Sequence, residues 1–161
     1  MRFFILLWAC LTFCKMIHAN DLVDSLRDAK IDYYIVESQN NSFPGGNYDL
    51  ALLYADSMCL LAEEGKDDKL IFSLEALRWR LYGDVYRRQG KVKQAYKAYR
   101  SSIAVIYRAG LENKGRYLGN CYKGLGYLFE EEEQLDSIYR YAQIVFDLPP
   151  DGSTYFFIKR T

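Results

Sequence analysis

The sequence is poor in the residues that most enzymes use for acid–base or metal chemistry. It has one histidine, His18, in an apolar N-terminal stretch. We expect this stretch to be cleaved, and without His18 the mature chain has no Ser-His or Cys-His nucleophile pair and no imidazole metal ligand. The glycines at Gly45-Gly46 and Gly124-Leu125-Gly126 lack the spacing of phosphate-cradling loops. The sequence therefore favours a protein that is not an enzyme, with no catalytic residue, metal site or cofactor.

Proline and net charge are also scarce. The chain has 3 prolines, and its 21 Lys and Arg residues balance its 21 Asp and Glu residues. A nucleic-acid-binding protein usually carries a basic excess, so we expect no nucleic-acid partner. Half of the 161 residues are hydrophobic, which is sufficient for one domain with its own core. Together with 15 tyrosines, this composition is typical of packed amphipathic helices.

Residues 1–19 have the features of a signal peptide. Arg2 supplies a positive charge, residues 3–14 form an apolar run, and Ile17-His18-Ala19 offers a cleavage site. The run is shorter than the roughly 20 residues that span a bilayer, so we expect no membrane span in the mature chain. We expect an exported protein, periplasmic or secreted. Lipid anchoring through the weak lipobox at residues 7–10 is the less favoured alternative.

From Leu22 onward, apolar residues recur at helical spacing, and strand-like alternation is not sustained. Breaks rich in glycine, proline, asparagine or charge separate the periodic segments. The pattern predicts an all-α protein with six helices, over residues 22–38, 47–64, 69–88, 92–109, 114–131 and 134–147.

The helices repeat along the chain with an offset of 43 or 44 residues. The recurring positions hold glycine, another small residue or an aromatic. They are Gly46 and Gly90, Ala51 and Ala95, Trp79 and Tyr122, Gly83 and Gly126, and Tyr86 and Phe129. A shared register through two helices and a turn indicates a repeat of about 43 residues.

The segment Trp79 to Tyr86 resembles the first helix of a tetratricopeptide repeat, with an aromatic, an apolar, a small and an aromatic residue in the family's order. Residues 122–129 repeat this pattern, and Pro150 lies where the family places its terminal proline. The second-helix positions match at Gly90, Ala95, Tyr99 and Ser102. The repeat is longer than the family's usual 34 residues and is similar to the long-repeat bacterial variety.

The resemblance implies a right-handed α-solenoid of about three antiparallel helix pairs over residues 20–152. Glycines in the helices then allow close helix contacts beside aromatic rings, and we expect Gly83 and Gly126 at such positions and Gly65 in a turn. Residues 153–161 form a C-terminal tail, which either caps the last repeat or begins a further helix. The uncapped C-terminal end is a candidate for self-association.

The resemblance also implies a concave face, built by the first helices, on which a protein or peptide binds. The predicted groove residues are Arg80, Asp84, Arg87, Lys123, Tyr127 and Glu130. Three cations among them suit an acidic or carboxylate-bearing peptide. Family members that clamp a C-terminal carboxylate have asparagine where this chain has Asp84 and Tyr127. As an alternative, Arg80 and Asp84 simply pair four residues apart on an exposed helix.

We therefore expect an exported, non-catalytic scaffold that binds a protein or peptide. One alternative is the extracytoplasmic sensor part of a longer bacterial regulator. Another, from a different class, is a small carbohydrate-binding or hydrolytic protein that uses tyrosines and glutamates. Against it, the run Glu130 to Glu133 is typical of a solvated turn. The helical pattern also favours core positions for Tyr82, Tyr86, Tyr96, Tyr99 and Tyr122.

Cleavage after Ala19 would leave two cysteines, Cys59 and Cys121, in an oxidising compartment. In the expected solenoid a whole helix pair separates them, whereas a disulfide needs Cα atoms within about 7 Å. We expect two buried free cysteines. The same cleavage removes Arg2 and Lys15, and so leaves 19 basic residues against 21 acidic ones.

Overall fold

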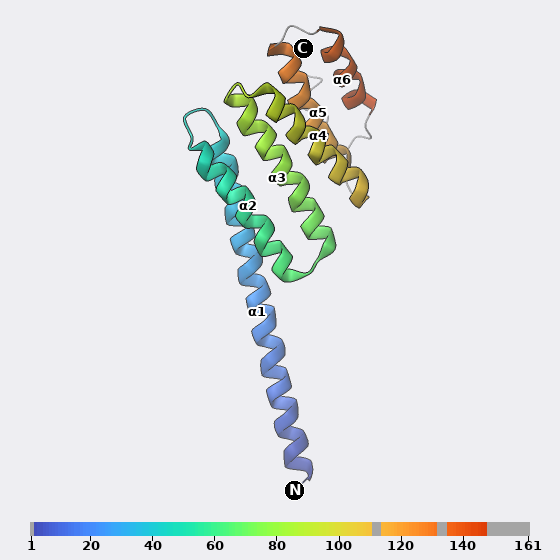
Figure 1. The fold of residues 1–161 in the computed structure, drawn as a ribbon. Helices are drawn as coiled ribbons and strands as arrows, with labels where there is room; N and C mark the ends of the chain where they lie inside the picture. Colours follow the sequence, from blue (N-terminus) through green and yellow to red (C-terminus); the bar gives the residue numbers. More distant parts are fainter. Residues whose placement is uncertain (1, 111–113, 132–134, 148–161) are drawn as a thin grey trace.

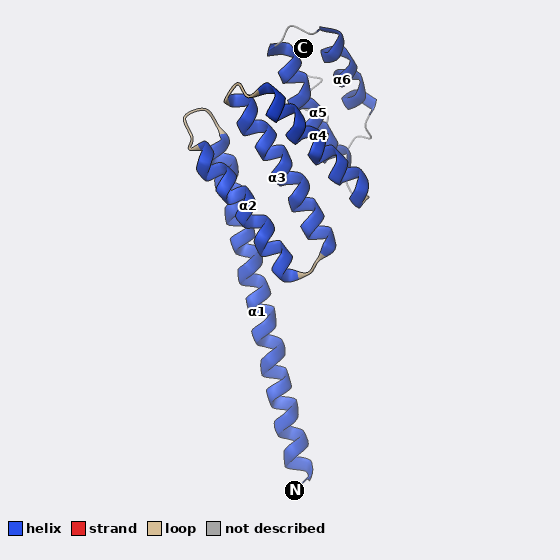
Figure 2. Ribbon diagram, in the orientation of Figure 1, coloured by secondary structure: helices blue, strands red, loops and turns tan. Residues whose placement is uncertain are grey.

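The computed structural model describes residues 2–110, 114–131 and 135–147. It contains six helices and, within these ranges, no strand (Figures 1 and 2). The all-α prediction is confirmed, and each predicted helix is present. The helices are α1 (Arg2–Ser42), α2 (Tyr48–Gly65), α3 (Asp68–Arg88), α4 (Val92–Ala109), α5 (Lys114–Glu131) and α6 (Leu135–Asp147).

The helix α1 is longer than predicted at both ends. It was expected over residues 22–38, but it runs unbroken from Arg2 to Ser42, and Figure 1 shows its N-terminal part standing away from the other helices. The helix therefore continues through the predicted cleavage position after Ala19, and cleavage there remains a prediction. The predicted Pro150 match and the tail at 153–161, including the self-associating C-terminal end, lie outside the described residues.

Local sequence explains where the helices begin and end. The side chains of Asn47 and Asp67 precede α2 and α3, and each accepts hydrogen bonds from backbone N–H groups two and three residues later. The turn after α3 needs Gly90, whose φ is +69°. In the turn after α1 the positive φ belongs to Gly45, although Gly46, like Gly90, lies two residues before the start of the next helix, as the predicted offset of 44 residues requires.

Neighbouring helices pack in chain order, and α3 also contacts α1 and α5. Two clusters of buried side chains result. One joins α1, α2 and α3 around Met58 and Leu81, and the other joins α3, α4 and α5 around Tyr99 and Leu125. Side chains of α6 pack against the second cluster.

The two cysteines are buried and free, as predicted, and lie in different core clusters. Burial raises the pKa of both Cys59 and Cys121 to about 11. A raised pKa keeps each thiol protonated and unreactive at neutral pH.

Four of the five tyrosines predicted to be in the core pack there. Tyr99 is fully buried, Tyr122 is nearly so, and Tyr82 and Tyr86 are partly buried. Tyr96 is different, because 39% of it is exposed, although its ring meets that of Phe129 edge-on. Helix packing thus accounts for these four tyrosines.

Two glycines allow the Tyr99 ring to lie between helices, and only one of them was predicted. A Cβ atom added at Gly83 would lie 2.6 Å from the ring, and one at Gly124 would lie 2.3 Å from it. A Cβ at Gly126 would meet nothing within 4 Å, so the prediction that Gly126 is a packing position is wrong. Residues two positions apart on a helix point to nearly opposite faces. Gly124, and not Gly126, therefore faces α4.

The expectation that Gly65 lies in a turn is also wrong. It is the last residue of α2, and a Cβ there would lie 2.6 Å from the guanidinium of Arg27. The left-handed turn residue is the next one, Lys66, with φ +58°.

Alanine at positions 124 and 126 of the same helix should change stability in opposite directions. We expect Gly124→Ala to lower the free energy of unfolding by about 1–3 kcal/mol, because its methyl group overlaps the Tyr99 ring. Gly126→Ala has open space and should raise stability by up to about 1 kcal/mol through helix propensity. Thermal and urea unfolding of the two variants checks this, and equal shifts would remove the packing role of Gly124.

Candidate functional site

A cavity of about 280 Å³ lies where the end of α1 meets α3 and α5. We call it the α3–α5 groove. Its charged lining residues are Arg80, Asp84, Arg87, Arg88 and Lys123. Its uncharged lining residues include Gln39, Ser42, Phe43, Asn120 and Tyr127. Four cations therefore share this space with one carboxylate.

Five of the six predicted groove residues line the α3–α5 groove. They are Arg80, Asp84, Arg87, Lys123 and Tyr127. The sixth, Glu130, is exposed near the end of α5 and is not part of the lining. Sequence reasoning missed Arg88 and the end of α1, which meet at the groove. The first helix carries no repeat pattern that would place its end there.

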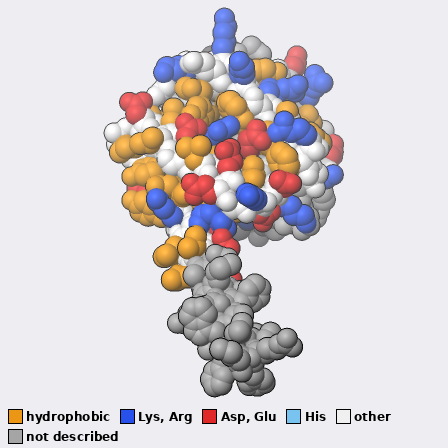
Figure 3. All heavy atoms as spheres, turned by 60° about the horizontal axis from the view of Figure 1, so that its bottom comes forward, with side chains coloured by type: hydrophobic (Ala, Val, Ile, Leu, Met, Phe, Trp, Pro, Cys, Tyr) orange, Lys and Arg blue, Asp and Glu red, His pale blue; other side chains and the backbone are white. Residues whose placement is uncertain are grey.

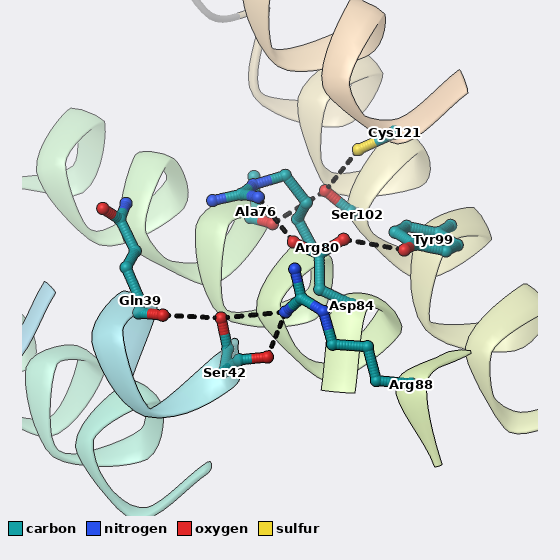
Figure 4. A network of polar contacts seen from close by, with 9 residues as sticks. All are labelled: Gln39, Ser42, Ala76, Arg80, Asp84, Arg88, Tyr99, Ser102 and Cys121. Atoms are coloured by element: carbon teal, nitrogen blue, oxygen red, sulfur yellow. Dashed lines mark hydrogen bonds and ion pairs between the residues drawn. The ribbon is translucent and has the colours of Figure 1, made fainter. Parts of the chain in front are cut away.

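The carboxylate of Asp84 is held from two sides at the base of the groove (Figure 4). Tyr99 Oη donates a hydrogen bond of 2.7 Å to Asp84 Oδ1, and Arg80 Nη1 donates one of 2.7 Å to Asp84 Oδ2. The ion pair was expected on an exposed helix, but both of its side chains are only 20% exposed. Asp84 thus fixes the direction of Arg80 and links α3 to α4.

Burial and the neighbouring Asp84 carboxylate raise the pKa of Tyr99 above its ordinary value of 10.0. The phenol therefore stays protonated and remains a donor at neutral pH. A second polar link lies behind it, where Ser102 Oγ donates to the backbone oxygen of Ala76 at 2.7 Å and receives the Cys121 thiol at 3.1 Å (Figure 4). These bonds tie α3, α4 and α5 together below the groove.

Arg88 fastens the end of α1 to the groove. Its Nη1 atom donates to the backbone oxygen of Ser42 and, at 3.1 Å, to Ser42 Oγ (Figure 4). The hydroxyl of Ser42 in turn donates to the backbone oxygen of Gln39 at 2.8 Å. Carbonyl groups at a helix end lack partners within the helix, and a cation is well suited to bind them. The guanidinium also lies 5.0 Å from the centre of the Phe43 ring.

Two further cations meet at the ring of Tyr127. The Arg87 guanidinium lies 5.2 Å and the Lys123 Nζ 5.7 Å from its centre. Burial lowers the pKa of Lys123, and the charges of Arg80 and Arg87 lower it further, whereas Asp84 acts in the opposite direction. The groove lining therefore brings four cations and one carboxylate together, and a positively charged lining favours an anionic ligand.

Within the described ranges, no group of three or more His, Cys, Asp or Glu side chains is arranged to hold a metal ion. Within the same ranges, no helix combines the length and the apolar character that a membrane crossing requires. In comparisons with known proteins, no family model, no curated protein and no solved structure matches the chain.

Removing the Tyr99 hydroxyl tests how far the groove depends on the bond to Asp84. We expect Tyr99→Phe to lower the free energy of unfolding by about 1.5–3 kcal/mol, because it deprives a partly buried carboxylate of a donor. Tyr82→Phe is the matched control, since the Tyr82 hydroxyl donates to Asp56 at 2.7 Å and 46% of the Asp56 side chain is exposed. Urea unfolding should show a smaller loss, about 1 kcal/mol or less, for the control.

The raised pKa of Tyr99 predicts a loss of stability in alkali. Above pH 10.0 the unfolded chain releases the Tyr99 proton while the folded chain keeps it, so the free energy of unfolding falls as the pH rises. Cys59 and Cys121 add to this fall above pH 9.0 in every variant that retains them. Unfolding measured on both sides of pH 10.0 should show a shallower fall for Tyr99→Phe than for the wild type, and identical slopes would contradict the assignment.

Proposed function

We propose that this chain is a non-catalytic module that binds an acidic peptide segment of a partner protein in the α3–α5 groove. The observation that carries the proposal is the groove's charge: Arg80, Arg87, Arg88 and Lys123 surround a single carboxylate, Asp84. A partner that brings carboxylates places negative charge among these cations and gains hydrogen bonds from guanidinium groups.

In this proposal the six helices are three antiparallel pairs, stacked as a right-handed α-solenoid similar to tetratricopeptide repeats. The contacts of α3 with both α1 and α5 support it, because alternate helices meet in such a stack. The placing of Tyr99 against Gly83 and Gly124 also supports it, since small residues beside an aromatic ring bring helices close together, within one pair at Gly83 and between adjoining pairs at Gly124.

The cations of the groove have different tasks in the proposed complex. Arg80 pairs with Asp84, and Arg88 binds the end of α1, so both also hold neighbouring segments in place. Arg87 and Lys123 lie against the Tyr127 ring, and we assign to them the contacts with the peptide's carboxylates. The amide of Asn120 can both donate to and accept from a peptide backbone.

Export belongs to the same proposal. The features of residues 1–19 support a signal peptide, after which the module acts in the periplasm or outside the cell. Scaffold binding of this kind requires neither a cofactor nor a metal.

Selection from a pool of random peptides with acidic, neutral and basic compositions tests the proposed binding. We expect acidic peptides to be enriched. We also expect Arg87→Glu or Lys123→Glu to weaken their binding at least about tenfold, which is the loss of one charge-assisted hydrogen bond of about 1.5 kcal/mol. Arg108→Glu is the control, because Arg108 is an α4 cation that pairs with Glu75 at 2.9 Å and is not part of the groove lining.

The two outcomes of this selection are distinct. Binding that the groove variants weaken and the Arg108 variant retains supports the proposal. Binding that survives both groove reversals in folded protein, or a selected pool without acidic enrichment, would place the partner on another surface.

A further inference from the structure

The α3–α5 groove has an apolar side and a charged side. On the side of α1 its lining holds Phe43, the first residue after α1, and Leu81, a side chain of the core cluster that joins α1, α2 and α3. On the side of α5, Arg87 and Lys123 lie against the ring of Tyr127. The helix α3 lies between α1 and α5 and contacts both. A ligand that fills the groove therefore meets both kinds of surface.

Exposure of Phe43 would not mark a site by itself. Figure 3 shows hydrophobic side chains exposed at several places on one face of the molecule, and scattered ones are normal on protein surfaces. Phe43 is distinguished by its position. It is 57% exposed, it lines the cavity, and the Arg88 guanidinium lies 5.0 Å from the centre of its ring. An accessible aromatic ring among cations is suited to a ligand that is both apolar and acidic.

The turn after α1 holds Phe43 in its place at the groove. The backbone oxygen of Phe43 accepts a hydrogen bond of 2.9 Å from the N–H of Gly46. The preceding residue, Ser42, receives the Arg88 guanidinium at both its backbone oxygen and its hydroxyl (Figure 4). A Cβ atom at Gly46 would overlap the backbone of Asn41, so glycine is what lets the turn close this tightly. Because the turn is already ordered, a ligand that packs on the ring loses little affinity in ordering it.

We propose that the acidic segment bound in this groove also carries an apolar side chain, within a few residues of its carboxylates, that packs on Phe43. The inference rests on the proposed function, because it takes the carboxylates to lie at Arg87 and Lys123. From there the segment crosses α3 toward the end of α1, where the accessible apolar lining is the Phe43 ring. The cavity of about 280 Å³ is smaller than most pockets that enclose a small ligand, so the acidic and apolar residues lie close together in the segment.

The apolar contact allows the groove to discriminate among acidic segments. Attraction between carboxylates and exposed cations depends little on the rest of the segment, and salt weakens it. Burial of an apolar side chain against an aromatic ring depends on contact area, and screening by salt does not act on it. Charge therefore brings acidic segments to the groove, and the residue that meets Phe43 ranks them by affinity.

Three pools of short synthetic peptides test the inference. The first two contain equal numbers of Asp and Glu residues, and their remaining positions hold Leu, Ile or Phe in the first pool and Ser, Thr or Gln in the second. The third pool keeps the apolar residues of the first and replaces Asp and Glu by Asn and Gln. We expect the protein to enrich peptides of the first pool over those of the other two.

Substitution of Phe43 identifies the contact. Phe43→Ala should weaken binding of a selected first-pool peptide at least about fivefold, as truncation of an interface anchor does, and Phe43→Leu should retain most of the affinity. Leu53→Ala is the matched control, since Leu53 on α2 is 58% exposed and lies outside the groove lining. Urea unfolding checks that each variant folds.

A double-mutant cycle shows whether the two side chains touch. Calorimetry compares the selected peptide with a version in which Ala replaces its apolar residue, each on wild-type and Phe43→Ala protein. The two changes together should weaken binding clearly less than the product of their separate effects. Effects that multiply would overturn the contact.

The outcomes separate this inference from the proposed function. Suppose that first- and second-pool peptides bind equally, that Arg87→Glu or Lys123→Glu weakens them, and that Phe43→Ala does not. That result would overturn the inference and leave the proposed function standing. Third-pool peptides that bind through Phe43 as tightly as acidic ones would overturn the proposed function and keep the Phe43 contact. Binding absent from all three pools would overturn both.

Discussion

The placing of the Tyr99 ring is the contact on which the groove depends. The ring is fully buried, and it lies against the glycine positions of α3 and α5, where no Cβ atom fits. Its hydroxyl donates to Asp84, and Asp84 holds Arg80. This one side chain of α4 therefore sets the separation of α3 and α5, which line the groove. It also holds the pair of Asp84 and Arg80 at the base of the groove. A larger residue at either glycine would move a helix as well as displace a ring.

The groove gathers four cations around one carboxylate. Burial and the charges of Arg80 and Arg87 lower the pKa of Lys123, which means that its charged form is less stable here than in water. Arg88 is compensated by the carbonyl at the end of α1, and Arg80 by Asp84. In the proposed function, an anion that enters the groove would stabilise the charged form of Lys123.

Much of the fold follows from the sequence, because helix periodicity and break residues act locally. The bounds of α2 to α5 differ from the predicted ones by one residue at most, and the expected separation of Cys59 from Cys121 is observed. The groove residues on α3 and α5 were found by counting along one helix face, which needs only the helical period. The same count also selected Glu130, which is not part of the lining, because the helix face continues beyond the end of the groove.

The features that could not be predicted from the sequence depend on contacts between distant segments of the chain. Repeat matching selected Gly126, but which of two nearby glycines meets Tyr99 depends on the rotation of α5 about its axis. Arg88 reaches Ser42 across 46 positions of chain, and no local pattern records that bond. Nor did the pattern predict how far α1 extends, since an apolar run that resembles a signal peptide is equally able to continue a helix.

The most direct test of the groove is a nuclear magnetic resonance titration of isotope-labelled protein with an acidic peptide taken from the selection. The account predicts that amide shifts concentrate on Arg80 to Arg88, on Asn120 to Tyr127 and on the end of α1 at Ser42 and Phe43. It also predicts that the side-chain signal of Lys123 shifts as its pKa rises toward the ordinary lysine value. Shifts confined to α2, α4 or the outer side of α1, with the groove unchanged, would contradict it.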